Sequence, residues 1–138
     1  LFLQFFKKNL TGELIALQYL PGVICYQFGT EHFILNGEWN DEDYRECMMG
    51  WKIAQRALAS REYDILIMDE FLYALTYEMI RWEEFAKVMD TRCQELEVIL
   101  TGRKPIPQIL EYADLVTNMV MVKHPYQQGI TARKGIEY

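Results

Sequence analysis

Two adjacent carboxylates, Asp69 and Glu70, follow directly after an apolar run at residues 65–68. A short continuous apolar run is typical of a strand that is covered on both faces, as in a parallel sheet. Ligands of open α/β sheets bind at the carboxyl ends of the strands, where an acid can hold a nucleotide-bound Mg²⁺ directly or through water. The pair is therefore a candidate Mg²⁺-nucleotide site, although a buried strand with a solvated acidic turn would give the same pattern.

A second expected strand, Glu97–Leu100, carries the apolar residues 98–100 and is followed by the turn residues Thr101, Gly102 and Arg103. Because parallel strands end at one edge of a sheet, the two strand ends are expected to converge there. Arg is suited to multidentate contacts with phosphate oxygens, so Arg103 and its neighbour Thr101 are candidate phosphate-binding residues. The alternative for Arg103 is a surface ion pair with an acid such as Glu111.

The rest of the chain must supply the elements that position these residues. Further strands are expected at residues 1–6, 23–28 and 115–122. Helices are expected at residues 41–58 after the N-cap Asn40, and at residues 71–77, Trp82–Asp90 and residues 107–113. Strands that alternate with helices predict an α/β fold with a mainly parallel sheet flanked by helices.

Composition excludes several classes of protein. The net charge of −6 argues against a general nucleic-acid binder, because such proteins neutralise phosphates with basic patches. No apolar run approaches the roughly 18 residues of a membrane span, so no membrane association is expected. The three cysteines, Cys25, Cys47 and Cys93, show neither disulfide-framework nor zinc-site spacing, which fits a reducing cytoplasm.

The sequence contains neither of the two common glycine-rich phosphate motifs, G-x-x-x-x-G-K-[ST] and G-x-G-x-x-G. It also begins without Met, inside a segment that reads as a buried strand. We therefore expect residues 1–138 to form a single α/β nucleotide-binding domain that lacks its N-terminal strand and phosphate loop. This segment alone is expected to be inactive as an enzyme.

Three sequence blocks resemble the P-loop ATP:corrinoid adenosyltransferases of the CobA/BtuR/CobO type: ILIMDEFLYALTYEMI, VILTGRKPIPQILEYADLVTNM and VKHPYQQGITARKGIEY. The segment CMMGW, residues 47–51, resembles the family's helix before the acidic strand. The resemblance runs from Leu1 to Tyr138. It implies a RecA-like P-loop NTPase fold and a homodimer that transfers the 5′-deoxyadenosyl group of ATP to Co(I) of a corrinoid. Tripolyphosphate would be released, in cobalamin biosynthesis or salvage.

The resemblance also implies roles for particular residues. Metal binding at the triphosphate maps to Glu70, with Asp69 as its strand-end neighbour. The family has a Phe-x-Trp pair that closes over the lower face of the corrinoid and helps to displace the lower axial ligand of cobalt. Phe33 matches the Phe and is thus the candidate catalytic residue, whereas Leu35 stands at the Trp position, with Trp39 four residues on. A flavin-dependent reductant is expected to supply the reduced cobalt.

Two other functions stay open from the sequence. One is a P-loop ATPase or kinase-like enzyme in which Asp69 and Glu70 serve hydrolysis or phosphoryl transfer. The other is a catalytically empty fold that binds corrinoids as a carrier module. The products discriminate between these functions, because adenosyl transfer releases tripolyphosphate whereas the ATPase or kinase releases ADP or free phosphate.

Overall fold

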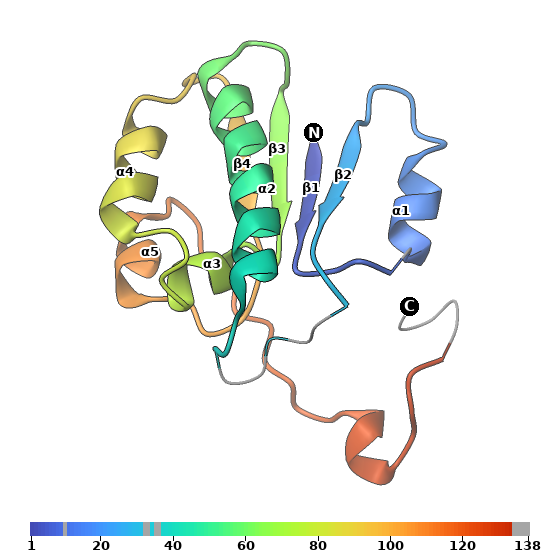
Figure 1. The fold of residues 1–138 in the computed structure, drawn as a ribbon. Coiled ribbons are helices and arrows are strands. Elements are labelled where there is room, and N and C mark those ends of the chain that lie inside the picture. The colour runs from blue at the N-terminus through green and yellow to red at the C-terminus, as the bar shows by residue number, and fades with distance from the viewer. Residues whose placement is uncertain (10, 32–33, 35–36, 134–138) are drawn as a thin grey trace.

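A computed structural model of the chain describes residues 1–9, 11–31, 34 and 37–133 (Figure 1). Strands and helices alternate through these residues, as the sequence predicted. The elements are β1 (Phe2–Phe5), α1 (Gly12–Leu17), β2 (Cys25–Phe28), α2 (Asp41–Ala59), β3 (Ile65–Asp69), α3 (Leu72–Thr76), α4 (Trp82–Asp90), β4 (Glu97–Leu100), α5 (Pro107–Tyr112) and the 3-10 helix η1 (Pro125–Gln128). No helix among the described residues has both the length and the apolar character needed to cross a bilayer.

The four strands form one sheet in the order β2-β1-β3-β4, and every pair is parallel. In its register, Leu3 of β1 lies opposite Tyr26 of β2 and Met68 of β3. All strands therefore end at the same edge of the sheet, the lower edge in Figure 1. The predicted α/β class with a parallel sheet flanked by helices is confirmed, and the arrangement is consistent with a RecA-like P-loop fold.

The core lies between one face of the sheet and helix α2, which packs against β1, β2 and β3. Alternate strand residues point into it, because side chains of a strand project to opposite faces in turn. Its fully buried side chains include Leu3, Phe5, Leu66, Met68, Trp51, Phe71 and Phe85. Burial of each such side chain stabilises the fold by roughly 1.5–3 kcal/mol, so this face anchors the strands that carry the acidic turn.

Helix α2 begins at the N-cap that the sequence predicted. Asn40 Oδ1 accepts hydrogen bonds from the backbone nitrogens of Glu42 and Asp43, and Asp43 Oδ2 accepts one from Asn40 N. This capping box satisfies backbone donors that the first helical turn would otherwise leave free. Asp43 Oδ1 also accepts a hydrogen bond from Thr30 Oγ1, which ties the start of α2 to the residues after β2.

The opposite face of the sheet is less covered. Ile65 of β3 and Ile99 of β4 are each 46% exposed there. Helix α1, which the sequence analysis did not predict, lies beside β2 and away from α2 (Figure 1). Its Glu13 accepts a hydrogen bond from Gln4 of β1. This contact brings α1 to the carboxyl edge of the sheet where Asp69 and Glu70 lie, called the acidic edge below.

The prediction of a strand at residues 115–122 is wrong. The structure shows no regular element there, and all eight residues are exposed, including Leu115 at 84% and Val122 at 92%. A strand needs a neighbouring backbone to satisfy its N–H and C=O groups, and none of the four described strands pairs with this segment. The described chain beyond this segment, including η1, lies away from the sheet below its carboxyl edge (Figure 1).

Candidate functional site

The acid pair at the end of β3 is held by Thr101, which follows β4. Thr101 Oγ1 donates a hydrogen bond of 2.7 Å to Asp69 Oδ1 and accepts one of 3.0 Å from the backbone N–H of Glu70. The backbone N–H of Thr101 in turn donates to the carbonyl oxygen of Met68. The structure thus brings Asp69, Glu70 and Thr101 together at one edge of the sheet.

Glu70 has an unfavourable conformation and environment. Its φ of +62° lies in the left-handed region, which costs a residue with a Cβ atom roughly 1–2 kcal/mol. Its Oε2 atom is buried and accepts no hydrogen bond from the described residues. Burial raises the pKa of the Glu70 carboxyl, the charge of Asp69 raises it further, and Lys7 and Arg103 oppose the shift. A strained carboxylate with an unsatisfied oxygen and a perturbed pKa is typical of a functional residue.

The other oxygen of Asp69 faces residues that the sequence analysis did not single out. Asp69 Oδ2 accepts a hydrogen bond of 3.0 Å from Gln4 Nε2 and lies 3.5 Å from Lys7 Nζ. Lys7 Nζ also lies 3.7 Å from Glu13 Oε1. Gln4 could have been noticed in the sequence, because it is a polar residue inside the apolar run of β1. Lys7 follows it three residues later in the chain.

Arg103 lies in the exposed turn after β4. Its positive charge acts on Glu70 and on Tyr73, since it lowers the pKa of both groups against larger raising effects of burial. Gly102 allows this turn to lie close to Leu72 of α3, because its φ is +146° and an added Cβ would lie 2.8 Å from Leu72 Cβ. Arg103 is therefore close enough to the acids to act on an anion bound beside them, yet it stays open to solvent.

The acidic edge fits Mg²⁺ that arrives with a nucleotide. Within the described residues, no group of three or more His, Cys, Asp or Glu side chains could hold a metal ion alone. Mg²⁺ in nucleotide enzymes is usually bound by one or two carboxylates, with waters and substrate phosphates as the other ligands. Glu70 can supply its free oxygen, whereas each Asp69 oxygen already accepts a hydrogen bond and favours contact through water.

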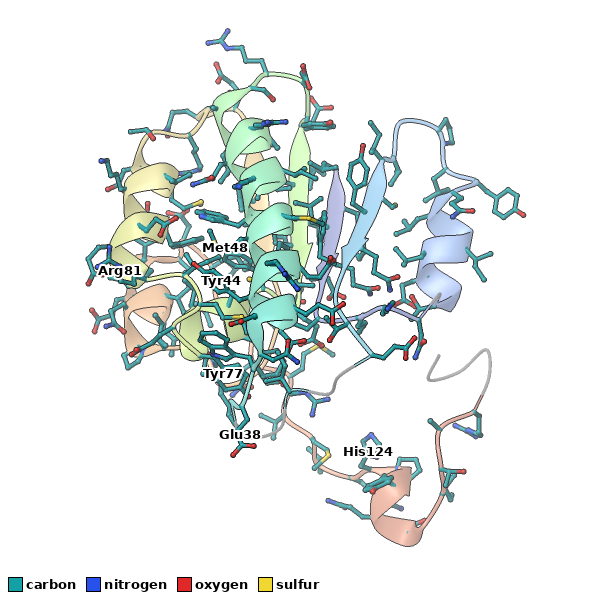
Figure 2. The ribbon with its side chains drawn as sticks, viewed as in Figure 1. Glu38, Tyr44, Met48, Tyr77, Arg81 and His124 are labelled. Atoms are coloured by element: carbon teal, nitrogen blue, oxygen red, sulfur yellow. The ribbon has the colours of Figure 1, made fainter. Side chains whose placement is uncertain are left out.

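A row of aromatic side chains borders the same edge. Tyr73 stacks on Tyr77, with ring centroids 5.5 Å apart, and meets the ring of Phe6 edge-on at 6.3 Å. Trp39 stacks on Tyr44 at 5.7 Å, and its Nε1 donates to the carbonyl oxygen of Tyr77 at 3.2 Å. Figure 2 shows Tyr44 and Tyr77 near the amino-terminal end of α2. The row thus places partly exposed aromatic rings beside the acids.

The predicted corrinoid-binding residues Phe33 and Leu35 lie outside the described residues. Gly37, which follows them in the sequence, lies against the aromatic row, because an added Cβ there would lie 2.9 Å from the Tyr77 ring. Trp39 is fixed in that row by its stacking on Tyr44 and its hydrogen bond to Tyr77.

Comparison with known proteins gives consistent matches along the chain. Residues 1–138 match the sequence model of the family described as ATP:corrinoid adenosyltransferase BtuR/CobO/CobP. A corrinoid adenosyltransferase of Pseudomonas aeruginosa is 30% identical over 128 residues, which cover 93% of this chain and 63% of that protein. Another from Escherichia coli K12 is 32% identical over 127 residues, which cover 92% of this chain and 64% of that protein.

The protein named corrinoid adenosyltransferase CobA in Salmonella typhimurium is 31% identical over 127 residues, with the same coverage of 92% and 64%. The chain therefore spans less than two thirds of the length of these curated relatives. The match to the family model nevertheless covers residues 1–138 without a gap at either end. This chain belongs to the ATP:corrinoid adenosyltransferase BtuR/CobO/CobP family.

Proposed function

We propose that the protein transfers the 5′-deoxyadenosyl group of ATP to Co(I) of a corrinoid and releases tripolyphosphate, in cobalamin biosynthesis or salvage. Its family membership supports this function, as do the names of its relatives. The structural observation that carries it is Glu70, a strained strand-end carboxylate whose buried oxygen has no partner among the described residues. Such an oxygen suits a cation bound to a triphosphate.

In the proposed reaction, Co(I) of the substrate attacks the ribose C5′ with its electron pair. The cobalt–carbon bond forms while the bond between C5′ and its oxygen breaks, and tripolyphosphate leaves with that bonding pair. Cobalt ends formally as Co(III), and no proton needs to move. Catalysis by the protein then rests on orientation of the two substrates and on stabilisation of the leaving negative charge.

We assign a separate role to each residue at the acidic edge. Glu70 would hold Mg²⁺, and Asp69 would contact its water ligands, while Lys7 and Arg103 place positive charge beside the leaving group. When bound, Mg²⁺ would neutralise part of the triphosphate charge. Thr101 donates its one hydroxyl proton to Asp69, so we assign it to the orientation of the acids rather than to a direct phosphate contact.

Further elements of the site belong to the proposal. ATP and the corrinoid are the substrates that the family name implies. We infer that Phe33 displaces the lower axial ligand of cobalt and that Leu35 adds apolar contact there. Because the 138 residues contain no glycine-rich phosphate motif, we assign the phosphate loop to sequence outside residues 1–138.

We also propose the partners and the compartment. The enzyme would act as a homodimer and receive Co(I) through a flavin-dependent reductant of Co(II). A cytoplasmic location is supported by Cys25, Cys47 and Cys93, which are all free thiols in the structure.

The test is a product assay on the complete protein with ATP, Mg²⁺ and a chemically reduced corrinoid. We expect equal amounts of adenosylcorrinoid and tripolyphosphate, and Glu70→Ala should lower the rate at least tenfold, about 1.4 kcal/mol in barrier height. Formation of ADP or free phosphate in place of tripolyphosphate would instead identify an ATPase or kinase. Corrinoid binding without ATP consumption would identify a carrier module.

A further inference from the structure

Gln4 is a polar side chain in an apolar position of the fold. It lies on β1, between β2 and β3, and is 0% exposed. Gln4 and Asp43 are the buried polar or charged residues of the described chain. A buried amide destabilises a protein unless its hydrogen bonds are satisfied, so its presence in a central strand calls for a specific partner set.

The Gln4 side chain satisfies that condition completely. Its Nε2 donates to Asp69 Oδ2 and to Glu13 Oε1, each at 3.0 Å, and its Oε1 accepts from Gln27 Nε2 at 2.9 Å. Both protons of the amide are thus used on carboxylates. Its orientation is fixed by chemistry, because the reversed amide would point its oxygen at two negatively charged groups.

These contacts restrict Asp69 from the side opposite Thr101. Thr101 holds Oδ1 at 2.7 Å, and Gln4 holds Oδ2 at 3.0 Å, so rotation of the carboxylate would break one hydrogen bond or the other. Lys7 approaches Oδ2 as well, but its side chain is 38% exposed and its amine stands at 3.5 Å. The buried amide is therefore the more rigid of the two supports.

We propose that Gln4 is a positioning residue at the acidic edge, which fixes the Asp69 carboxylate for contact with the water ligands of a Mg²⁺ ion that is bound with a nucleotide. This inference rests on the function proposed above and extends it to a residue on a different strand. Outer hydrogen-bond partners of this kind typically change metal affinity or activity by about 10–100-fold when they are removed.

The chain offers a matched control for this role. Gln27 lies opposite Gln4 on β2 and belongs to the same hydrogen-bonded group, but its amide donates to Gln4 and to the carbonyl oxygen of Asn9. The same substitution can be made at both positions, Gln4→Met and Gln27→Met, with similar change in shape and polarity. Gln4 is buried and Gln27 is partly exposed, so their effects on stability can differ. A role in stability alone would leave cation binding and kcat similar in the two folded variants.

The experiment uses the complete protein and two measurements. The first is binding of Mn²⁺, as a probe for Mg²⁺, in the presence of ATP, followed by electron paramagnetic resonance. The second is the Mg²⁺ dependence of kcat for adenosyl transfer. We expect Gln4→Met to weaken Mn²⁺ binding or lower kcat by at least about tenfold, whereas Gln27→Met changes either by less than about threefold. Equal effects of the two variants on both measurements would overturn the proposal.

A double-mutant cycle tests whether Gln4 acts through Asp69. If it does, Gln4→Met should cost little more in the Asp69→Asn background, because the group that it positions has already been changed. Additive losses would overturn the proposal. Should Gln4→Met fail to fold, the side-chain amide of Gln4 can be followed by nitrogen-15 NMR in the unmodified protein. Its resonances should shift when Mg²⁺ and ATP bind, and unchanged resonances at saturation would overturn the proposal.

The design separates failure of this inference from failure of the proposed function. A parent protein that binds Mn²⁺ and ATP without forming adenosylcorrinoid would contradict the proposed function, while the Mn²⁺ comparison of Gln4→Met with Gln27→Met would still decide the role of Gln4. A parent protein with full adenosyl transfer and an unimpaired Gln4→Met variant would contradict the inference alone.

Discussion

Glu70 combines two unfavourable features, so its replacement should stabilise the protein while it impairs function. Its backbone lies at φ +62°, and its buried Oε2 has no hydrogen-bond partner among the described residues. The informative pair of variants is Glu70→Gly and Glu70→Ala. Both remove the carboxylate, but glycine alone also removes the Cβ atom that makes a left-handed backbone unfavourable.

The expected magnitudes follow from these features. Relief of the left-handed backbone is worth roughly 1–2 kcal/mol, and the extra chain entropy of glycine offsets about 0.5–1 kcal/mol of it. Loss of a buried unsatisfied oxygen adds about 1–3 kcal/mol, and the lower end applies because the Glu70 side chain is partly exposed. Glu70→Gly should therefore gain about 1.5 kcal/mol, or roughly 5 °C in Tm for a chain of this size.

The assay is thermal unfolding of the parent and both variants at pH 7, together with the rate of adenosyl transfer. We expect Tm to rise from parent to Glu70→Ala to Glu70→Gly, while both variants lose at least about tenfold in rate. A Glu70→Gly variant that is less stable than the parent would refute the assignment of strain. Full activity in either variant would remove Glu70 from the site.

The pH dependence of this gain separates its two causes. Burial, followed by the charge of Asp69, raises the pKa of Glu70 above its usual value of 4.5. Because the pKa is raised in the folded state, the protonated Glu70 carboxyl makes a contribution to the free energy of unfolding that is fully present below pH 4.5. This contribution is lost as the pH rises through the folded-state pKa, where Glu70 becomes charged. The advantage of Glu70→Gly over the parent should therefore grow from pH 4 to pH 7. A constant advantage would assign the whole gain to the backbone.

Three further substitutions test other parts of the structure. Arg103→Ala should raise the KM for ATP and change the stability by less than about 0.5 kcal/mol, since the side chain is exposed; a lower Tm with unchanged KM would make Arg103 a surface ion-pairing residue. Phe33→Ala should slow the reaction from Co(II) far more than the reaction from prereduced Co(I), and equal losses from both would defeat the assignment. Gly50→Ala should destabilise the protein by about 1–3 kcal/mol in chemical denaturation, because the new Cβ would lie 2.6 Å from Phe5 and 2.7 Å from Phe28. An unchanged unfolding midpoint would show that α2 can move away from the sheet.

The parts of this site that follow from strand patterns could be predicted from sequence. The apolar runs before Asp69 and before Thr101 identify two parallel strands, and parallel strands end at one edge, so the two residues were expected to lie close together. The N-cap Asn40 was readable for a similar reason, because a side-chain acceptor followed by acids is a local signal. Each of these features depends on a few consecutive residues.

Features that depend on distant contacts could not be predicted in this way. The role of Gln4 arises from Asp69 and Glu13, which lie 65 and 9 residues away in sequence. The positive φ of Glu70 is imposed by the turn that joins β3 to α3, and a glutamate gives no local indication of it. Residues 115–122 have the apolar composition of a strand, but a strand forms only beside a partner, and the described strands provide none for this segment.

The most direct test of adenosyl transfer is to follow which bond of ATP breaks. ATP can be labelled with oxygen-18 at the oxygen that joins the ribose C5′ to the α-phosphorus, and the products separated and analysed by mass spectrometry. If cobalt attacks C5′, the label should appear entirely in tripolyphosphate, and the ribose C5′ should be bonded to cobalt. Label that stays on an adenine nucleotide, as ADP or AMP, would show that a phosphorus–oxygen bond breaks instead and would contradict the proposed function.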